Sequence, residues 1–563
     1  MNHRRFLVPI ALVGAFGTAL TPALASASTQ SAPGTATSRA ANSTSAGYEY
    51  SSPAANSVFH RTSATSPNPG MFVDMAGGNT STYSVQFQIT LGNLQSGTVT
   101  ISTGWGDGSS DAQTVTAPVK NGQAVLEFSH TYSALGIYRV LVMASDGQGD
   151  DAMNATVIET GSEYVPYGPT RILDTRTLGA GGAIAPHGTY ALKVVGAGTA
   201  GATIPAGVTA VALNITATQG TGNGFLTVYG DDTYGNIPTP LPATSNLNYA
   251  ANQTVANLVI APVGADGTVD IYNGAPKGSV HVVADVAGYF TASTQSAFLA
   301  VGPQRILDTR SGVGAAKAPI GAGKTLNVTV AGGADGVPAT ASAVVIHFTT
   351  VDSTRNGLIS AFPAGQAAPN VSNLNYAAGS ITSNTAVVPV GKDGQISLEN
   401  TSTGTTDVVG DLAGYFTTTP GTGASSYIPL PAPVRYIDSR PGATDALNGQ
   451  GPLVGPLGAL TAYPFPMPFT DMTTAAVPDV VTNATVTSPT GNGDLALYPY
   501  NPAQPSVPTT SNLNYASGQT LSNLAFVAPS TIADVSGNHD SAIYLGGKGT
   551  AEVIVDEFGE FIE

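Results

Sequence analysis

The sequence of 563 residues has no cysteine, a single tryptophan and few charged side chains. Without cysteine it can form no disulfide, carry no lipid on a cysteine and offer no thiolate to a metal. Lys, Arg, Asp and Glu make up only 10% of the residues, and the formal net charge is −16. No Lys/Arg cluster follows the first few residues, and a grip on nucleic acid needs such cations to neutralise phosphates. We therefore expect no nucleic-acid partner.

Long apolar runs are also missing after the first residues, so we expect no membrane span. Residues 1–27 combine Arg4 and Arg5, an apolar run over residues 6–20 and the small residues Ala25-Ser26-Ala27. This is the pattern of a secretory signal peptide. The arginine pair hints at twin-arginine export, but its spacing favours the general route. We predict a secreted protein, either released or held non-covalently at the cell surface.

The rest of the chain divides by composition. Residues 28–70 are rich in Ser, Thr, Ala and Pro without a hydrophobic period, which predicts a flexible spacer. Beyond them the chain should fold, because 42% of all residues are hydrophobic. A chain of this length fits about four domains.

Residues 71–160 alternate polar and apolar residues over 83–89, as half-buried strands do. They also contain Trp105-Gly-Asp-Gly, His130-Thr-Tyr132 and Gly136 with Tyr138. These residues resemble the PKD domain, and the resemblance implies an immunoglobulin-like β-sandwich of an extracellular protein. Trp105 either fills the core of this sandwich or lies exposed, where it could stack on a sugar or bind a matrix protein.

The remaining residues repeat a three-part signature three times. Its parts are RILDTR at residues 171–176 and 305–310 with RYIDSR at 435–440, SNLNY at 245–249, 372–376 and 511–515, and DVAGYF at 285–290 with DLAGYF at 411–416 and DEFGEF at 556–561. Repeats of this length are domains and not solenoid units. We place them at residues 161–293, 294–419 and 420–563, the last being the most divergent.

Each repeat predicts short strands, for example at residues 209–216, 225–229, 258–260, 269–272 and 280–283, and no helical period. The predicted fold class is all-β, with tandem β-sandwich or jelly-roll domains after the PKD-like one. The signature resembles a repeat of secreted proteins of Streptomyces and related actinobacteria. That resemblance implies location and modularity, and it implies no activity.

The acidic and basic residues of the first element stand out on a sparsely charged chain. In an extended strand, Asp174 and Arg176 share one face, whereas Arg171 lies on the other. They either form an internal ion pair, with Asp285 or its equivalents Asp411 and Asp556 as a further partner, or bind sugar hydroxyls or carboxylates. A catalytic carboxylate pair is disfavoured, because a neighbouring Arg lowers the pKa of an Asp. The candidate binding residues here are Asp174, Arg176, Asp308, Arg310, Asp438 and Arg440.

The asparagines of SNLNY have the same two interpretations. Asn246 and Asn248 share one strand face, while Leu247 and Tyr249 share the other. Side-chain amides can bind sugar hydroxyls, and they can equally satisfy buried backbone groups. The candidate binding residues are Asn246, Asn248, Asn373, Asn375, Asn512 and Asn514. The Gly-Tyr-Phe of the third element is expected to bend the last strand and close the end of the domain.

Nothing in the sequence indicates an enzyme. It has no G-x-S-x-G and no H-E-x-x-H, and its histidines do not recur: His347 stands where the other repeats have Asn214 and Asn483. We therefore predict no catalytic residue, no zinc and no cofactor. Calcium is conceivable on two loops, although neither matches an EF-hand. The weak calcium candidates are Asp107, Asp111, Asp146 and Asp150.

Three functional hypotheses remain. The first is a non-enzymatic interaction protein whose three repeats bind cell-wall or extracellular polysaccharide, or an extracellular protein, with avidity. The second is a structural stalk or assembly protein whose repeats bind each other or another protein. The third is a secreted hydrolase with a site in one repeat. Burial of the signature residues separates the hypotheses: together on a concave surface they are a site, and buried with partners they are framework.

Overall fold

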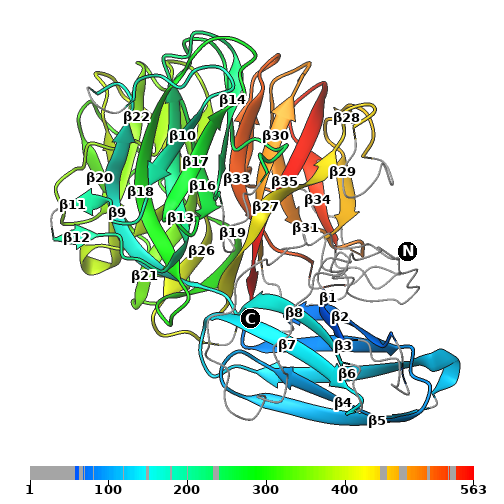
Figure 1. Cartoon of the computed structure of the whole chain (residues 1–563). Coiled ribbons are helices and arrows are strands. Elements are labelled where there is room, and N and C mark those ends of the chain that lie inside the picture. The colour runs from blue at the N-terminus through cyan, green and yellow to red at the C-terminus, as the bar shows by residue number, and fades with distance from the viewer. Residues whose placement is uncertain are drawn as a thin grey trace. The chain divides into compact units, whose positions relative to one another are not determined.

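The computed structural model describes residues 57–61, 68, 70–79, 82–117, 119–147, 151–177, 181–199, 201–231, 240–421, 423–443, 453–467, 479–503, 508–530, 532 and 540–563. The predicted signal peptide, and most of the predicted spacer, lie outside these residues. The chain forms two compact units, which divide near residue 158 (Figure 1). Every described sheet is antiparallel, and the only described helices are two short 3₁₀ turns, at Lys120–Gly122 and Lys392–Gly394. The predicted all-β class is confirmed.

The first unit is a sandwich of two sheets, ordered β1-β8-β7-β4-β5 and β2-β3-β6. Its strands are β1 Ser57–Arg61, β2 Phe72–Asn79, β3 Ser84–Gly92, β4 Gly97–Gly104, β5 Ser110–Ala117, β6 Gln123–Thr131, β7 Ile137–Ser145 and β8 Asp151–Glu159. Strand β1 corrects the predicted spacer, because residues 57–61 pair with β8 and so belong to the sandwich. In β3, Val85, Phe87 and Ile89 are buried as their alternation predicted.

The second unit contains the three repeats, each folded as a lobe of two sheets. Lobe 1 has β9 Glu163–Asp174, β10 Thr189–Lys193, β11 Gly198–Thr199, β12 Ala202–Thr203, β13 Val208–Thr218, β14 Gly224–Tyr229, β15 Leu247–Tyr249, β16 Val255–Pro262, β17 Thr268–Asn273 and β18 His281–Thr291. Its main sheets are ordered β16-β13-β18-β9 and β10-β17-β14-β15. The strands predicted in the first repeat are therefore present.

Lobes 2 and 3 repeat this arrangement. Lobe 2 has β19 Ala297–Asp308, β20 Thr325–Thr329, β21 Ala341–Val351, β22 Gly357–Pro363, β23 Leu374–Tyr376, β24 Thr382–Pro389, β25 Gln395–Asn400 and β26 Asp407–Thr417. Lobe 3 has β27 Ser426–Asp438, β28 Leu457–Gly458, β29 Ala462–Pro466, β30 Asp479–Thr487, β31 Gly493–Pro499, β32 Leu513–Tyr515, β33 Leu521–Val527, β34 Asp540–Leu545 and β35 Thr550–Ile562. Their sheets are β19-β26-β21-β24 with β20-β25-β22-β23, and β27-β35-β30-β33 with β29-β34-β31-β32.

One sheet of each lobe is buried on both of its faces, and we call it the inner sheet. In β13, Val211, Leu213 and Ile215 point into the core of lobe 1, whereas Ala210 and Ala212 point into a second core. A strand covered on both sides reads as a nearly continuous apolar run, which explains the weak alternation in this stretch. The other sheet, the outer sheet, has one face on the core of its lobe, and its opposite face points away from that core. In lobe 3 this opposite face carries a small buried cluster of Ala496, Tyr498, Ala542 and Tyr544.

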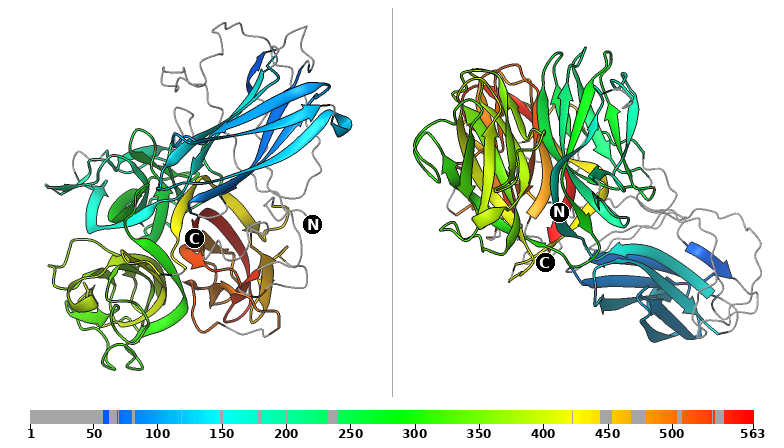
Figure 2. Two further views of the ribbon diagram at one scale, coloured as in Figure 1. Left: turned by 90° about the horizontal axis from the view of Figure 1, so that it is seen from below. Right: turned by 90° about the vertical axis from the view of Figure 1, so that its left-hand side faces the viewer.

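The second core is shared by all three lobes, which surround a common centre (Figure 2). The equivalent inner strands β16, β24 and β33 contact one another there. Its largest side chains come from the first and last strands of each lobe: Tyr164, Phe290, Phe298, Phe416, Tyr427 and Phe561. The prediction of domains in a row did not include this core. It makes residues 159–563 one packed unit.

The shared core also explains the Gly-Tyr-Phe element. Phe290, Phe416 and Phe561 do not close the end of their own lobe, as we predicted, but enter the shared core. The preceding glycine lies under an aromatic ring of the first strand. A Cβ atom on Gly288 would lie 2.2 Å from the ring of Tyr164, and one on Gly414 would lie 2.4 Å from the ring of Phe298. Glycine is therefore needed for this close approach of ring and backbone.

Candidate functional site

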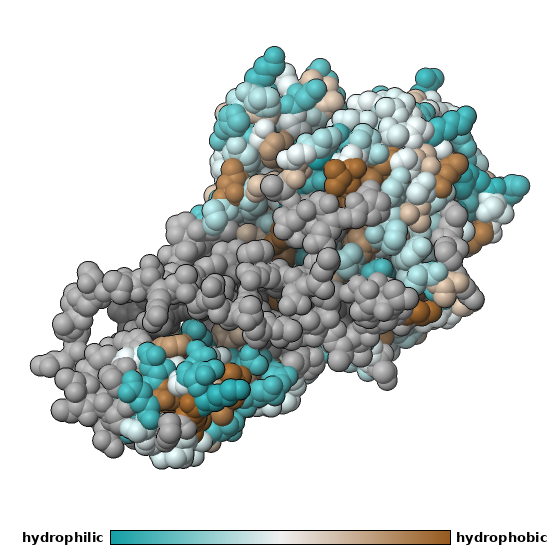
Figure 3. Space-filling view, turned by 90° about the vertical axis from the view of Figure 1, so that its right-hand side faces the viewer, coloured by the Kyte–Doolittle hydropathy of each residue, from teal (hydrophilic) through white to brown (hydrophobic). Residues whose placement is uncertain are grey.

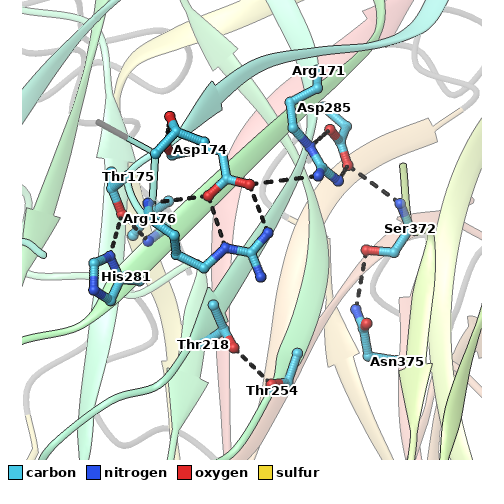
Figure 4. A network of polar contacts seen from close by, with 12 residues as sticks. Arg171, Asp174, Thr175, Arg176, Thr218, Thr254, His281, Asp285, Ser372 and Asn375 are labelled. Carbon is cyan, nitrogen blue, oxygen red and sulfur yellow. Dashed lines mark hydrogen bonds and ion pairs between the residues drawn. The ribbon is translucent and has the colours of Figure 1, made fainter. Parts of the chain in front are cut away.

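The charged residues of the signature form one connected network in each lobe (Figure 4). In lobe 1, Arg171 holds Asp285 through two hydrogen bonds, of 2.8 Å from Nε to Oδ1 and 3.2 Å from Nη2 to Oδ2. Its Nη1 lies 3.6 Å from Oδ2 of Asp174. Asp174 is in turn held by Arg176 through bonds of 2.8 and 2.6 Å. We call this Asp–Arg–Asp–Arg set a charge chain.

The other lobes repeat the charge chain with the same geometry. Its members are Asp411, Arg305, Asp308 and Arg310 in lobe 2, and Asp556, Arg435, Asp438 and Arg440 in lobe 3. Bidentate Arg–carboxylate pairs fix both position and orientation. The first and last strands of each lobe are therefore tied together by the first and third elements of the signature.

The face assigned to Arg171 was wrong. Strict alternation would separate Arg171 from Asp174, but a β-bulge lies between Arg171 and Leu173, which pair with Asp285 and Ala284. The extra residue, Ile172, shifts the alternation and brings both charges to one side. The same bulge occurs at residues 305–307 and 435–437. It is what allows one guanidinium to contact two carboxylates.

The pKa values of the two aspartates in a charge chain shift in opposite directions. The hydrogen bond from Arg176 lowers the pKa of Asp174, and the bond from Arg310 does the same for Asp308. Burial raises the pKa of Asp285, and the pair with Arg171 opposes that rise. Asp174 therefore suits a permanent charge, as predicted, and not a proton donor.

Each charge chain also contacts a neighbouring lobe, at the SNLNY segment of that lobe or just before it. The backbone N–H of Ser372 in lobe 2 donates to Oδ2 of Asp285 in lobe 1 over 3.3 Å. The backbone of Ser245 in lobe 1 donates to Asp556 of lobe 3. Arg305 of lobe 2 donates to the carbonyl of Thr509 in lobe 3, two residues before SNLNY. Two of these three contacts therefore join the charge chain of one lobe to the SNLNY segment of another, and the third is made by Thr509 just before that segment.

Asparagines complete these contacts, which we call seams. Between lobes 1 and 2, Asn384 Nδ2 donates to Asn214 Oδ1 over 2.9 Å. Between lobes 3 and 1, Asn257 Nδ2 donates to Asn483 Oδ1 over the same distance. The recurring step from SNLNY to Asn257, Asn384 and Asn523 was visible in the sequence. Its role at the seams was not, because one chain does not reveal which copies touch.

The seam between lobes 2 and 3 departs from this pattern. His347 replaces the asparagine, and Thr385 stands where the other lobes have Leu258 and Leu524. Thr385 Oγ1 donates a hydrogen bond to the carbonyl of Leu524 over 2.7 Å, and it lies 3.1 Å from His347 Nδ1. His347 Nε2 is buried without a hydrogen-bond partner, and so is Asn523 Oδ1. This seam is therefore the least satisfied of the three.

Replacing His347 with Asn is expected to flatten the loss of stability on acidification. Burial lowers the pKa of His347 to about 3, from an ordinary value of 6.5. Between those values the unfolded chain binds a proton that the folded chain refuses, so stability falls as pH falls from 6.5 toward 3. The slope for one such group is at most about 1.4 kcal/mol per pH unit. Urea titrations at several pH values measure it.

The variant His347→Asn should show a shallower fall in unfolding free energy over this window than the wild type. Ile381→Ala, at a side chain 58% exposed, removes no titratable group; it is the control and should leave the slope unchanged. Equal slopes for His347→Asn and the wild type would mean that His347 is not held neutral in the fold.

The remaining candidate residues of the repeats lie mostly in the framework. Asn246 is buried and its Oδ1 accepts the backbone N–H of Val228, and Asn373 is placed equivalently. Asn512 does the same for Leu497. Asn248, Asn375 and Asn514 are partly exposed and bond the Ser three residues earlier. The guanidinium groups of Arg176, Arg310 and Arg440 are the most open, with 40–44% of the side chain exposed, but each is paired.

In the first unit, Trp105 is fully buried. Its ring stacks on His130 at 4.8 Å, and its Nε1 donates to Asp111 over 2.8 Å. The alternative of an exposed Trp105 that binds a ligand does not fit this position, because no ring surface is left for one. Tyr138 is partly exposed and so does not fill the core.

The weak calcium candidates do not come together among the described residues. Although partial burial alone would raise the pKa of Asp107, hydrogen bonds from Ser109 and His130 lower it to about 2. Asp111 is engaged by Trp105, and Asp146 is buried. Asp150 lies outside the described residues. No group of three or more His, Asp or Glu side chains that could hold a metal occurs in the part of the chain that the structure describes.

No known protein family matches the chain, and no curated protein matches it. Among solved structures, one of carbohydrate-binding modules from the β-sandwich superfamily matches 40% of this chain and 98% of its own, at 12% identity and a TM-score of 0.17. The triple jelly-roll protein of an archaeal virus turret matches 71% and 90%, at 10% identity and a TM-score of 0.14. A protein of Sulfolobus turreted icosahedral virus matches 76% and 90%, at 9% identity and a TM-score of 0.13. These likenesses are remote and assign no ligand.

The surface gives further limits. None of the described helices is long and apolar enough to span a membrane. The face drawn in Figure 3 is mostly hydrophilic or neutral, with small and separate hydrophobic patches over its described part. Scattered patches of this kind need no explanation as an interface.

Proposed function

We propose that this chain is a secreted, non-enzymatic interaction protein whose three fused lobes form one platform for extracellular or cell-wall polysaccharide. The observation that carries the proposal is the use of the recurring polar residues inside and between the lobes. The signature keeps the lobes at fixed positions, and the outward faces of the outer sheets are left to bind. Binding sites that are already held in a fixed arrangement lose little conformational entropy when several of them bind one polymer. Weak affinities of the single sites then combine into a higher overall affinity.

The charges of the signature support a non-enzymatic role. A glycoside hydrolase needs one carboxyl with a raised pKa that can reach its substrate. Asp174 has a lowered pKa, and Asp285, whose pKa is raised, is 2% exposed and held by two bonds from Arg171. Neither aspartate suits proton transfer to a bound sugar.

The extracellular setting rests on sequence patterns. The signal-like residues 1–27, the resemblance of the first sandwich to a PKD domain and the Streptomyces-type signature all favour export. Extracellular polysaccharide or a surface protein is the partner that such a setting offers. The abundance of acidic over basic residues favours a neutral polymer over a polyanion.

A structural protein that assembles with itself is the second candidate. Its support is that the lobes already bind one another through the signature. The seams run from lobe 1 to 2, from 2 to 3 and from 3 to 1, so this ring is closed and leaves no described copy of the seam surface for another chain. Assembly between chains would need a different surface, which places this candidate second.

Co-sedimentation with insoluble glycans tests the proposal. The purified chain would be mixed with cellulose, chitin and isolated bacterial cell walls, and the bound fraction measured at increasing glycan concentration. We expect saturable retention on at least one of them, little affected by salt because the contact is not an ion exchange. Folded protein that is retained on none of them would refute the polysaccharide proposal.

A further inference from the structure

The outward faces of the three outer sheets differ, although the sheets themselves are equivalent. On lobe 1, this face carries Phe225 from β14 and Tyr272 from β17, and both are partly exposed. The strand registers put Leu358 and Glu399 at the same places on lobe 2, and Asp494 and Tyr544 on lobe 3. At these two positions only lobe 1 has two aromatic residues, and their failure to recur in the other repeats kept them from standing out in the sequence.

The ring of Phe225 lies over the backbone of Gly274. A Cβ atom at Gly274 would lie 2.1 Å from that ring, so the ring occupies the space above the glycine. Tyr272 is next to it, with ring centroids 6.5 Å apart and planes at 57°. The hydroxyl of Tyr272 is 2.9 Å from Nδ1 of the exposed His187. The two rings are therefore held in place on the sheet and are open on one side.

Polar groups flank these rings on the same face. Asp270 lies two residues from Tyr272 along β17, is partly exposed and is hydrogen-bonded to the hydroxyl of Tyr229. Thr189 on β10 pairs in register with Tyr272 and is exposed. A pyranose has an apolar C–H face and a polar rim of hydroxyls. Fixed aromatic rings can contact the first, and the neighbouring carboxylate, hydroxyls and imidazole can bind the second.

We propose that the outward face of lobe 1, at Phe225, Tyr272, His187 and Asp270, is a binding site for neutral hexose polymers, including N-acetylated ones. The inference rests on the proposed function and names its site. Charge selects the ligand: Asp231, Asp266 and Asp270 outnumber the neighbouring cation Lys193, which donates to the carbonyl of Asp266, so uronic-acid or phosphate-bearing glycans are disfavoured. Phe225, Tyr272 and Asp270 are partly exposed on a sheet face, where they can meet a segment within a long chain.

Single alanine variants of the full chain test the site. Tyr272→Ala and Phe225→Ala should each weaken retention on the glycan that binds the wild type by about tenfold or more, as loss of a central aromatic contact does. Glu399→Ala and Leu358→Ala are the matched controls, because they change the same two positions on lobe 2. They should bind like the wild type. Unchanged thermal unfolding of each variant excludes misfolding as the cause of a loss.

The outcomes separate the site from the proposed function. Loss of binding with the lobe 1 variants alone supports the site. Equal binding by the wild type and Tyr272→Ala overturns the site and leaves the polysaccharide function standing. Binding by neither, on cellulose, chitin and cell walls, overturns both. Stronger binding to a polyanion such as pectate than to the neutral glycans would overturn the assigned ligand class.

Discussion

Replacing Phe561 with alanine is expected to destabilise all three lobes together, by about 3–5 kcal/mol. Phe561 is the last aromatic residue of lobe 3 and is 1% exposed. Its ring contacts aromatic rings from every lobe: Phe290 of lobe 1, Phe298 and Phe416 of lobe 2, and Tyr427 and Phe526 of lobe 3. Truncation leaves a cavity among all of them, and packed cores relax only partly around such a cavity.

Urea unfolding followed by far-ultraviolet circular dichroism measures this effect. Ile381→Ala is the control, because its side chain is 58% exposed and its loss should change stability by less than about 0.5 kcal/mol. If Phe561→Ala lowered the stability of lobe 3 and left lobes 1 and 2 as stable as before, the shared core would not couple the lobes.

Changing Asp556 to asparagine is expected to cost about 3 kcal/mol of stability. The carboxylate is fully buried, and it accepts two bonds from Arg435, of 2.8 and 3.2 Å. Without it, Arg435 keeps its charge in a largely buried position with one partner fewer. The same lobe supplies a control. Arg440→Gln removes a guanidinium whose side chain is 44% exposed, and Asp438 keeps its bond from Arg435 over 3.3 Å, so this variant should cost clearly less than Asp556→Asn.

A double variant sharpens this prediction. Arg435→Met with Asp556→Leu removes both members of the buried pair, while Asp438 keeps its two bonds from Arg440, and should recover part of the stability that Asp556→Asn loses. A double variant that is no more stable than Asp556→Asn would show that the two residues act independently, contrary to a paired role. Chemical denaturation of the three variants under one condition measures all of these free energies.

Much of each lobe was predictable, because local pattern decides it. The alternation correctly put Leu247 and Tyr249 on one strand face, and the structure shows that this face lies on the lobe core, at 0 and 4% exposure. Of the two interpretations of the signature aspartates and arginines, the internal ion pair matches the structure, with Asp285 paired to Arg171 and Asp174 to Arg176. A lowered pKa for Asp174 followed from its neighbouring arginine alone.

The rest depends on contacts between distant residues. The bulge at Ile172 is set by pairing with β18, so strict alternation gave the wrong face to Arg171. The shared core could not be predicted from the sequence, because Ala210 and Ala212 are small residues without a distinctive pattern. The residues they pack against come from the other two lobes as well. The aromatic face of lobe 1 was overlooked for a different reason. The residues that recur in all three repeats are those that every lobe needs for folding. The pair Phe225 and Tyr272 has no aromatic counterpart pair at the same two positions of lobes 2 and 3.

We infer that the three repeats fold as one unit around a shared core, and scanning calorimetry of the intact chain can show this. Besides the melting of the first sandwich, we expect a single transition for residues 159–563. Its calorimetric and van't Hoff enthalpies should agree, as they do for one cooperative unit. Three separable transitions, each with about a third of the enthalpy, would contradict the claim and return the repeats to independent domains.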